Sequence, residues 1–322
     1  MIKVQLVDYG VMTRFLIALL SAALALAGSQ SPAGRPTPGP LLRIDAVALD
    51  SRGNPVTDLT KDELEVRIAN YRVPIESLTA SDASAEGNGR VIVLLMDDAV
   101  VPLALTPRVR EIARRFVDRM SPGDRMAIVA LNGGAMELTA DRNRLLKGIN
   151  DYTVRAVGFT RLDLAGEHVL NTVTTLSRQL AEESSGRKTV VGIGAAWLFD
   201  TPIPPPTVGR DLRPEWTAAM RAAGFANVSV YAIEPGGVET SRFSGSDGFA
   251  SETGGRTFVN TNDSNQAVDQ VMREAANYYV IEVADPPIQR KSDLRELDVR
   301  ALRRGVTVRA RRQFPGTEVP AK

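Results

Sequence analysis

The spacing of apolar residues divides the middle of the chain into alternating strands and helices. Largely apolar runs of five to seven residues, of which residues 91–96 (VIVLLM) are apolar throughout, are typical of parallel strands buried on both faces. Between these runs, apolar residues recur with the 3.6-residue period of a helix. We expect strands at 91–96, 125–131, 136–139, 189–193, 228–233 and 256–260, and helices at about 106–120, 169–180, 214–224 and 264–277. This alternation predicts an α/β fold with a doubly wound, mostly parallel, Rossmann-like sheet.

The two ends of this region follow a different pattern. Residues 41–50, 64–68 and 73–78 alternate apolar and polar positions, as half-buried strands do. Residues 278–283 and 296–312 also resemble strands, and no helix separates them. We therefore expect a small β domain formed from both ends of the chain. In this division residues 41–80 are its first part, residues 90–277 the inserted α/β domain, residues 278–314 its second part and residues 315–322 a tail.

The N-terminal segment has the features of a signal peptide. An apolar run at residues 15–27 follows Arg14 and ends in the small-x-small sequence Ala25-Leu26-Ala27. The run is shorter than the roughly 20 residues of a membrane span, although an uncleaved anchor is the alternative interpretation. Residues 1–27 are thus predicted to be removed on export to the periplasm or beyond, whether translation starts at Met1 or Met12. Residues 28–40, rich in Pro, Gly and Ser, are predicted to be a linker.

Composition narrows the classes of function. The 39 Lys and Arg residues balance 38 Asp and Glu residues, giving a net charge of +1, so no general field favours nucleic acid. A local Arg-rich run near the C-terminus is read as a solvated sheet face: Arg300, Arg303, Arg304, Arg309, Arg311 and Arg312. The absence of Cys excludes disulfides, thiolate metal sites and Cys nucleophiles.

Candidate catalytic residues are scarce. The only histidine, His168, lies beside Val169 at the start of the predicted helix, where a packed or surface role is the ordinary one. A hydrolase needs a nucleophile and a positioned base, and no such motif is present. We predict that the protein is not an enzyme, and an exported hydrolase is kept as an alternative.

Several stretches of sequence carry a family resemblance. They are GNPVTDLTKDELEV (53–66), VIVLLMDD (91–98), SPGDRMAIV (121–129), GFTRLD (158–163), ETGGRTFVN (252–260) and RGVTVRARRQF (304–314). In order and spacing they resemble the von Willebrand factor A-type (VWFA) domain proteins, and more narrowly an exported VWFA-related group common in Acidobacteria. The resemblance covers nearly all of the predicted mature chain.

This resemblance implies a metal-ion-dependent adhesion site at the carboxyl edge of the sheet, where oxygen ligands hold Mg²⁺. Asp97 matches the leading Asp of the site, and Thr160, after Gly158, matches the Thr of a second loop. The two Ser positions are Ala99 and Val101, and Gly194 and Ala195 stand where the family usually places Asp.

We therefore expect a degenerate site without a bound cofactor, in which Asp97 caps a turn. The alternative is a metal-dependent adhesin, in which Asp97, Asp98 and Thr160, with Asp163 nearby, still hold Mg²⁺ or Mn²⁺.

The leading hypothesis is an exported module that binds another protein, without nucleic acid and without a membrane span after cleavage. Its binding rim is expected in the loops at residues 97–101, 158–163 and 195–206. The candidate residues are Asp97, Asp98, Ala99, Val101, Gly158, Thr160, Asp163 and Ala195. Apolar Ala99, Val100 and Val101 are expected to form an exposed contact surface.

Overall fold

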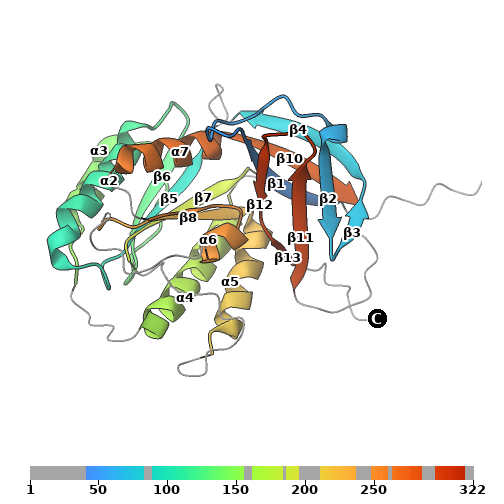
Figure 1. Cartoon of the computed structure of the whole chain (residues 1–322). Helices are drawn as coiled ribbons and strands as arrows, with labels where there is room; N and C mark the ends of the chain where they lie inside the picture. Colours follow the sequence, from blue (N-terminus) through green and yellow to red (C-terminus); the bar gives the residue numbers. More distant parts are fainter. Residues whose placement is uncertain are drawn as a thin grey trace, which may run out of the picture. The chain divides into compact units, whose positions relative to one another are not determined.

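The computed structural model contains a five-stranded parallel sheet with the strand order β6-β5-β7-β8-β9 (Figure 1). The strands are β5 (Val91–Met96), β6 (Arg125–Ala130), β7 (Lys188–Ile193), β8 (Val228–Ile233) and the short β9 (Thr257–Phe258). The structure describes residues 41–82, 89–155, 162–183, 186–195, 211–236, 248–259, 263–284 and 294–315. The expected α/β class with a parallel sheet is confirmed.

Helices cover both faces of this sheet, which explains why its strands are apolar without alternation. On β5, Ile92, Leu94 and Met96 pack against one helix layer, whereas Val91, Val93 and Leu95 pack against the other. The first layer is α2 (Thr106–Asp118), α3 (Arg142–Asp151) and α7 (Ser264–Ala276), and the second is α4 (Leu162–Leu180) and α5 (Arg213–Ala226). Every residue of β5 is therefore buried.

The sequence pattern missed two helices and misplaced the end of a third. Helix α3 follows Asp141, whose carboxylate accepts hydrogen bonds from the N–H groups of Asn143 and Arg144, and α6 (Gly248–Glu252) is a single short turn. Helix α5 does not end at Gly224. It continues to Ala226 and is capped by Asn227, which adopts the left-handed conformation at φ 58°.

Strands from the two ends of the chain pair in two antiparallel sheets, beside the helices in Figure 1. One sheet has the order β12-β1-β10-β4, formed by β1 (Leu41–Leu49), β4 (Ile75–Asp82), β10 (Asn277–Ala284) and β12 (Thr307–Ala310). The other has the order β13-β11-β2-β3, formed by β2 (Leu64–Ile68), β3 (Tyr71–Val73), β11 (Leu294–Ala301) and β13 (Gln313–Pro315). Apolar residues of both sheets share one core.

The strand predicted at residues 73–78 is two strands in the structure. Val73 pairs with Val66 in one sheet, whereas Ile75 pairs with Val283 in the other. Pro74 lies between them and has no N–H to donate to a ladder, so the chain changes sheets there. A short 3-10 helix, η1 (Lys61–Glu63), precedes β2, and another, η2 (Leu103–Leu105), precedes α2.

The sequence predicted that the Arg-rich segment is a solvated sheet face, and this prediction is wrong for part of the segment. Arg311 is 6% exposed and Arg309, which contacts the buried Glu274 of α7, has a side chain that is 21% exposed. Arg300 is exposed as expected. The buried Arg311 joins the C-terminal strands to the end of α5, because it donates to the carbonyl of Gly224.

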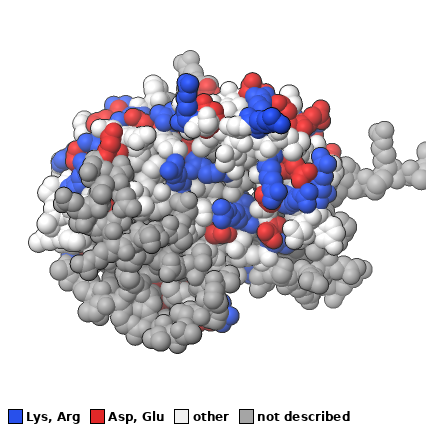
Figure 2. Space-filling model, in the orientation of Figure 1, with Lys and Arg blue, Asp and Glu red and all other residues white. Residues whose placement is uncertain are grey.

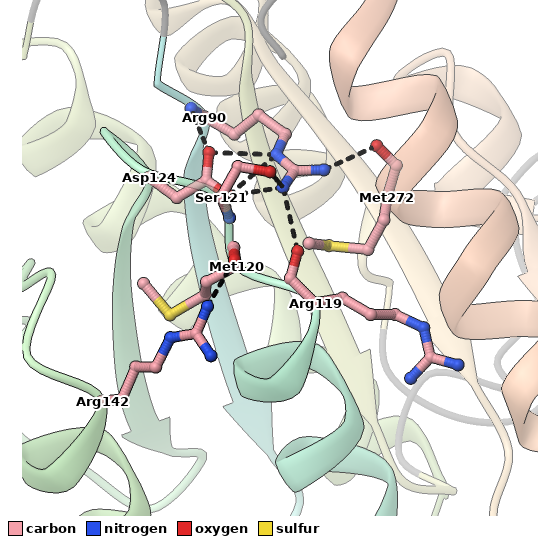
Figure 3. A network of polar contacts seen from close by, with 7 residues as sticks. All are labelled: Arg90, Arg119, Met120, Ser121, Asp124, Arg142 and Met272. Carbon is pink, nitrogen blue, oxygen red and sulfur yellow. Dashed lines mark hydrogen bonds and ion pairs between the residues drawn. The ribbon is translucent and has the colours of Figure 1, made fainter. Parts of the chain in front are cut away.

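A buried ion pair fixes the amino edge of the parallel sheet (Figure 3). Asp124, just before β6, is 1% exposed, and Arg90, just before β5, is 7% exposed. The Asp124 carboxylate accepts hydrogen bonds from Arg90 Nε at 3.0 Å, Arg90 Nη2 at 2.5 Å and the N–H of Ser121 at 2.7 Å. The guanidinium also donates to the carbonyls of Met272 and Arg119, so it links α7 and the end of α2 to the sheet.

Close backbone contact beside this pair requires glycine. A Cβ on Gly89 would lie 1.8 Å from the carbonyl oxygen of Gly123, and Gly123 itself has φ +91°. The Pro-Gly-Asp-Arg sequence at residues 122–125 is thus explained by the turn and by the buried carboxylate that follows it.

Charges of both signs are mixed on the face shown in Figure 2, where blue and red side chains lie next to each other over α2, α7 and the antiparallel strands. In the part of the chain that the structure describes, no helix combines the length and the apolar character needed to cross a bilayer.

Candidate binding site at the carboxyl edge of the parallel sheet

The strand order places a switch point between β5 and β7. From β5 the chain crosses to β6 on one side, and then to β7 and β8 on the other side. In open α/β sheets, ligands bind where the carboxyl ends of two such strands diverge. Asp97 and Asp98 follow β5, and Gly194 and Ala195 follow β7, so this is the edge that the sequence predicted as the binding rim.

Asp97 links the ends of the neighbouring strands β5 and β7 through hydrogen bonds. Asp97 is fully buried, and its Oδ1 accepts hydrogen bonds from the N–H groups of Ala99 at 3.0 Å and Val100 at 2.8 Å. Its Oδ2 accepts one from the N–H of Ala195, at 2.9 Å. Asp97 therefore caps the turn after β5, as expected, and also joins β5 to β7.

Gly194 allows this contact because it carries no side chain. A Cβ at this position would lie 2.0 Å from the Asp97 Cβ and 2.6 Å from its Oδ2. Position 194 therefore requires glycine, because any larger residue would overlap the side chain of Asp97.

The prediction that residues 99–101 form an exposed apolar contact surface is wrong. Ala99 is 6% exposed and packs in the core on the α4 and α5 side of the sheet. Val101 is 3% exposed and packs on the α2 and α3 side. Val100 is half-buried. The turn therefore sends its two outer side chains into opposite cores, and neither is available to a partner.

Three of the positions at which the resemblance places metal ligands offer no side-chain oxygen in the structure. Ala99 and Val101 have no oxygen in their side chains and are buried, and Ala195 contributes a main-chain N–H that is already bonded to Asp97. Mg²⁺ requires about six oxygen ligands in octahedral geometry and gives up water reluctantly. The two Ser positions and the Asp position of the VWFA pattern thus contain groups that cannot replace its water.

The other predicted rim residues are only partly described. Gly158 and Thr160 lie outside the described residues, as do residues 196–206. Asp163 lies in the first turn of α4, but its side chain also lies outside the described residues.

A pocket of about 270 Å³ lies beside the capped turn, next to β6. It is lined by Asp98, Gly133, Gly134, Asp151, Tyr152 and Arg155, among others. Most of these residues were missed by the sequence reasoning. The available signal was the pair Asp97-Asp98 after one buried strand together with Gly133-Gly134 after the neighbouring strand.

Asp98 is a buried charged residue in the lining of this pocket. The residue is 1% exposed, and its Oδ1 accepts a hydrogen bond from the N–H of Asn132 at 2.8 Å. Its Oδ2 is buried and accepts no hydrogen bond from any residue in the described part of the chain. Oδ2 forms a long ion pair with Arg155 Nε, at 3.7 Å, and the Arg155 side chain is 65% exposed. One carboxylate oxygen in the pocket thus retains capacity for a donor.

Tyr152 forms one wall of the pocket and is held rigidly. Its hydroxyl donates to the main-chain carbonyl of Asp97 at 2.5 Å, and its own carbonyl accepts from Arg110 Nε at 2.9 Å. Burial raises the pKa of Tyr152, and the negative charges of Asp97 and Asp98 raise it further. The phenol therefore stays neutral and acts as a hydrogen-bond donor in this position.

His168, the candidate base, lies on α4 and contacts the end of β6. Its Nε2 is 2.8 Å from the carbonyl oxygen of Leu131. Because a carbonyl only accepts, Nε2 carries the proton in this contact and donates it.

Comparison with known proteins gives no family assignment. No family model matches the sequence, and no curated protein is significantly similar to it.

Proposed function

We propose that the chain is an exported, non-enzymatic protein-binding module of the von Willebrand factor A type, with a degenerate metal site. The parallel sheet with helices on both faces supports this assignment, as do the sequence stretches that resemble the family. The apolar run at residues 15–27 supports export to the periplasm or the medium. That run lies outside the described residues.

Binding is proposed to use the pocket beside the capped turn. The observation that carries this proposal is the buried Oδ2 of Asp98, which accepts no hydrogen bond from the described residues although it lines the pocket. Its ion pair with Arg155 is long, at 3.7 Å, and the Arg155 side chain is 65% exposed, so a hydrogen-bond donor supplied by another molecule would stabilise this buried oxygen. We expect the partner to insert an N–H donor, such as a lysine or amide side chain, toward Asp98.

We propose no reaction at this edge because of the position of His168, the candidate general base. His168 donates from Nε2 to the carbonyl of Leu131, so this nitrogen is engaged in a contact to the main chain. A general base must also lie within reach of the proton that it removes, and His168 is not among the residues that line the pocket at Asp98. The proposal therefore assigns recognition, and no catalysis, to this edge of the sheet.

Filling the pocket should abolish partner binding. Gly134 is exposed, and a Cβ on it would have only the N of Ala130 near it, at 3.7 Å, so Gly134→Trp should fold and place an indole in the pocket. Ala140→Trp is the matched control, because Ala140 is exposed next to Thr139, which pairs with Met126 near the start of β6. Affinity capture from extracts of the native cells, quantified by mass spectrometry, should recover a partner with the wild type and Ala140→Trp, but at least about tenfold less with Gly134→Trp. Equal recovery with all three would contradict the proposed site.

A further inference from the structure

A second pocket, of about 330 Å³, lies at the opposite edge of the parallel sheet. It is located at the amino ends of β7 and β8, where β1 and the segment after β12 meet the last turn of α5. Its lining includes Arg43, Glu183, Lys188, Phe225, Ala226 and Arg311. These residues come from five separate segments of the chain, and the pocket has no part in the function proposed above.

Lys188, the first residue of β7, contributes a largely buried side chain and its positive charge to this pocket. The residue is 4% exposed, and its side chain makes no hydrogen bond or ion pair within the described part of the chain. Burial lowers the pKa of Lys188, and the positive charge of Arg43 lowers it further, against the opposing effects of Asp45 and Glu183. An ammonium group in a pocket wall, without a carboxylate bonded to it among the described residues, can be neutralised by an anionic ligand.

Arg311 contributes a second buried cation. It is 6% exposed, and it donates to two neutral acceptors, the carbonyl of Gly224 and the side-chain oxygen of Asn227, each at 2.5 Å. No carboxylate pairs with it among the residues that the structure describes. Burial lowers the pKa of Arg311 to about 10. Its charge, like that of Lys188, is therefore not neutralised locally.

The acidic groups near the pocket already have other partners. Glu183 forms an ion pair with Arg125 at 2.6 Å, and Asp45 forms one with Arg43 at 3.3 Å. The excess charge of the pocket is thus positive. Because Glu183 also lines it, a ligand with one negative charge is favoured over a doubly charged one such as phosphate.

An exposed aromatic ring at the mouth indicates what accompanies the anion. Phe225, in the last turn of α5, is 85% exposed and lines the pocket together with Ala226. We propose that this pocket binds a carboxylate on Lys188 and Arg311, with an adjacent apolar group of the ligand packed on Phe225. The carboxyl terminus of a peptide that ends in an apolar residue has this chemistry, and so does a small aromatic acid.

Calorimetric titration of the whole mature chain tests the proposal without any mutation. The probes are a short peptide that ends in phenylalanine with a free carboxylate, the same peptide as its C-terminal amide, 3-phenylpropionate and inorganic phosphate. We expect the free acid to bind with a Kd of about 1 mM or tighter, and the amide at least about tenfold more weakly. If phenylpropionate binds as well as the acid peptide, the ligand class is a small acid, and if only the peptide binds, it is a chain terminus.

Two variants and one control test whether Lys188 and Phe225 contact the ligand. Lys188→Met keeps the buried stem but removes the charge, and it should weaken the acid peptide at least about tenfold. Lys147→Met, at a lysine whose side chain is 77% exposed on α3, is the matched control and should change nothing. Phe225→Glu, at an exposed position that should not affect folding, should also weaken binding. Equal affinity of acid and amide, tighter binding of phosphate, or no binding of any acid would overturn the proposal.

Discussion

Replacing Asp124 with alanine is expected to lower the free energy of unfolding by about 3–5 kcal/mol, the cost of leaving one member of a buried ion pair without its partner. The carboxylate is 1% exposed and accepts hydrogen bonds from both Arg90 and the N–H of Ser121 (Figure 3). Its loss leaves the Arg90 guanidinium buried with only neutral acceptors. Urea denaturation followed by circular dichroism measures the change.

The control for this prediction is an exposed pair. Lys147 and Asp151 form an ion pair whose side chains are 77% and 63% exposed, and Asp151→Ala should cost less than about 1 kcal/mol. The double variant Arg90→Met with Asp124→Leu should recover much of the lost stability, because both charges are then removed together. If Asp124→Ala cost no more than Asp151→Ala, the ion pair would not be the element that fixes the amino edge.

Replacing Asp97 with alanine in the presence of EDTA is expected to lower the free energy of unfolding by about 3 kcal/mol. The change removes the acceptor of three main-chain N–H groups, on Ala99, Val100 and Ala195, and buried donors without an acceptor each cost about 1–3 kcal/mol. It also removes the carboxylate that joins the ends of β5 and β7.

A matched carboxylate is available as a control. Asp141 also accepts from two main-chain N–H groups, but it caps an exposed helix start, so Asp141→Ala should cost only about 1 kcal/mol. A cap and a metal ligand predict changes of opposite sign in the free energy of unfolding when Asp97 is replaced in EDTA. A carboxylate that serves mainly as a metal ligand is a liability when the metal is absent, and its removal in EDTA would then leave stability unchanged or raise it.

The parallel sheet was predictable from the sequence because burial on both faces leaves a local signal. Strand β8 occupies the predicted residues, since every side chain from Val228 to Ile233 is buried. Helix α3 left a weaker signal. Only Leu145 and Ile149 of its ten residues are buried, so its apolar face is too narrow to stand out against a polar loop.

The candidate site could be predicted only as a location. The Asp97-Asp98 pair after a buried strand predicted that these residues lie at the carboxyl edge of the sheet, and the structure has them there. The turn-capping role of Asp97 was also expected, because the residues beside it are apolar. The burial of Ala99 and Val101 could not be predicted, because it depends on how the turn directs them to the two helix layers. The pocket at Asp98 also requires tertiary structure, since it combines the ends of β5, β6 and α3.

The burial of Arg311 also could not be predicted from the local sequence. Alternating basic residues near the C-terminus have the pattern of a solvated strand, yet Arg311 is buried because Gly224 and Asn227, at the end of α5, supply acceptors for it. These acceptors lie more than eighty positions away in the sequence. A local pattern therefore cannot reveal them.

Asp97 is a structural cap, and we propose that recognition at this edge of the sheet needs no cation. The melting temperature of the wild-type protein, measured by calorimetry in EDTA and then in about 10 mM Mg²⁺ or Mn²⁺, tests both statements. A cation at a hundred times its Kd would stabilise the folded state by about 2.7 kcal/mol, which raises the melting temperature of a chain of this size by about 5 °C. We predict the same melting temperature in all three solutions, and a rise of that size that disappears in Asp97→Ala would contradict the account.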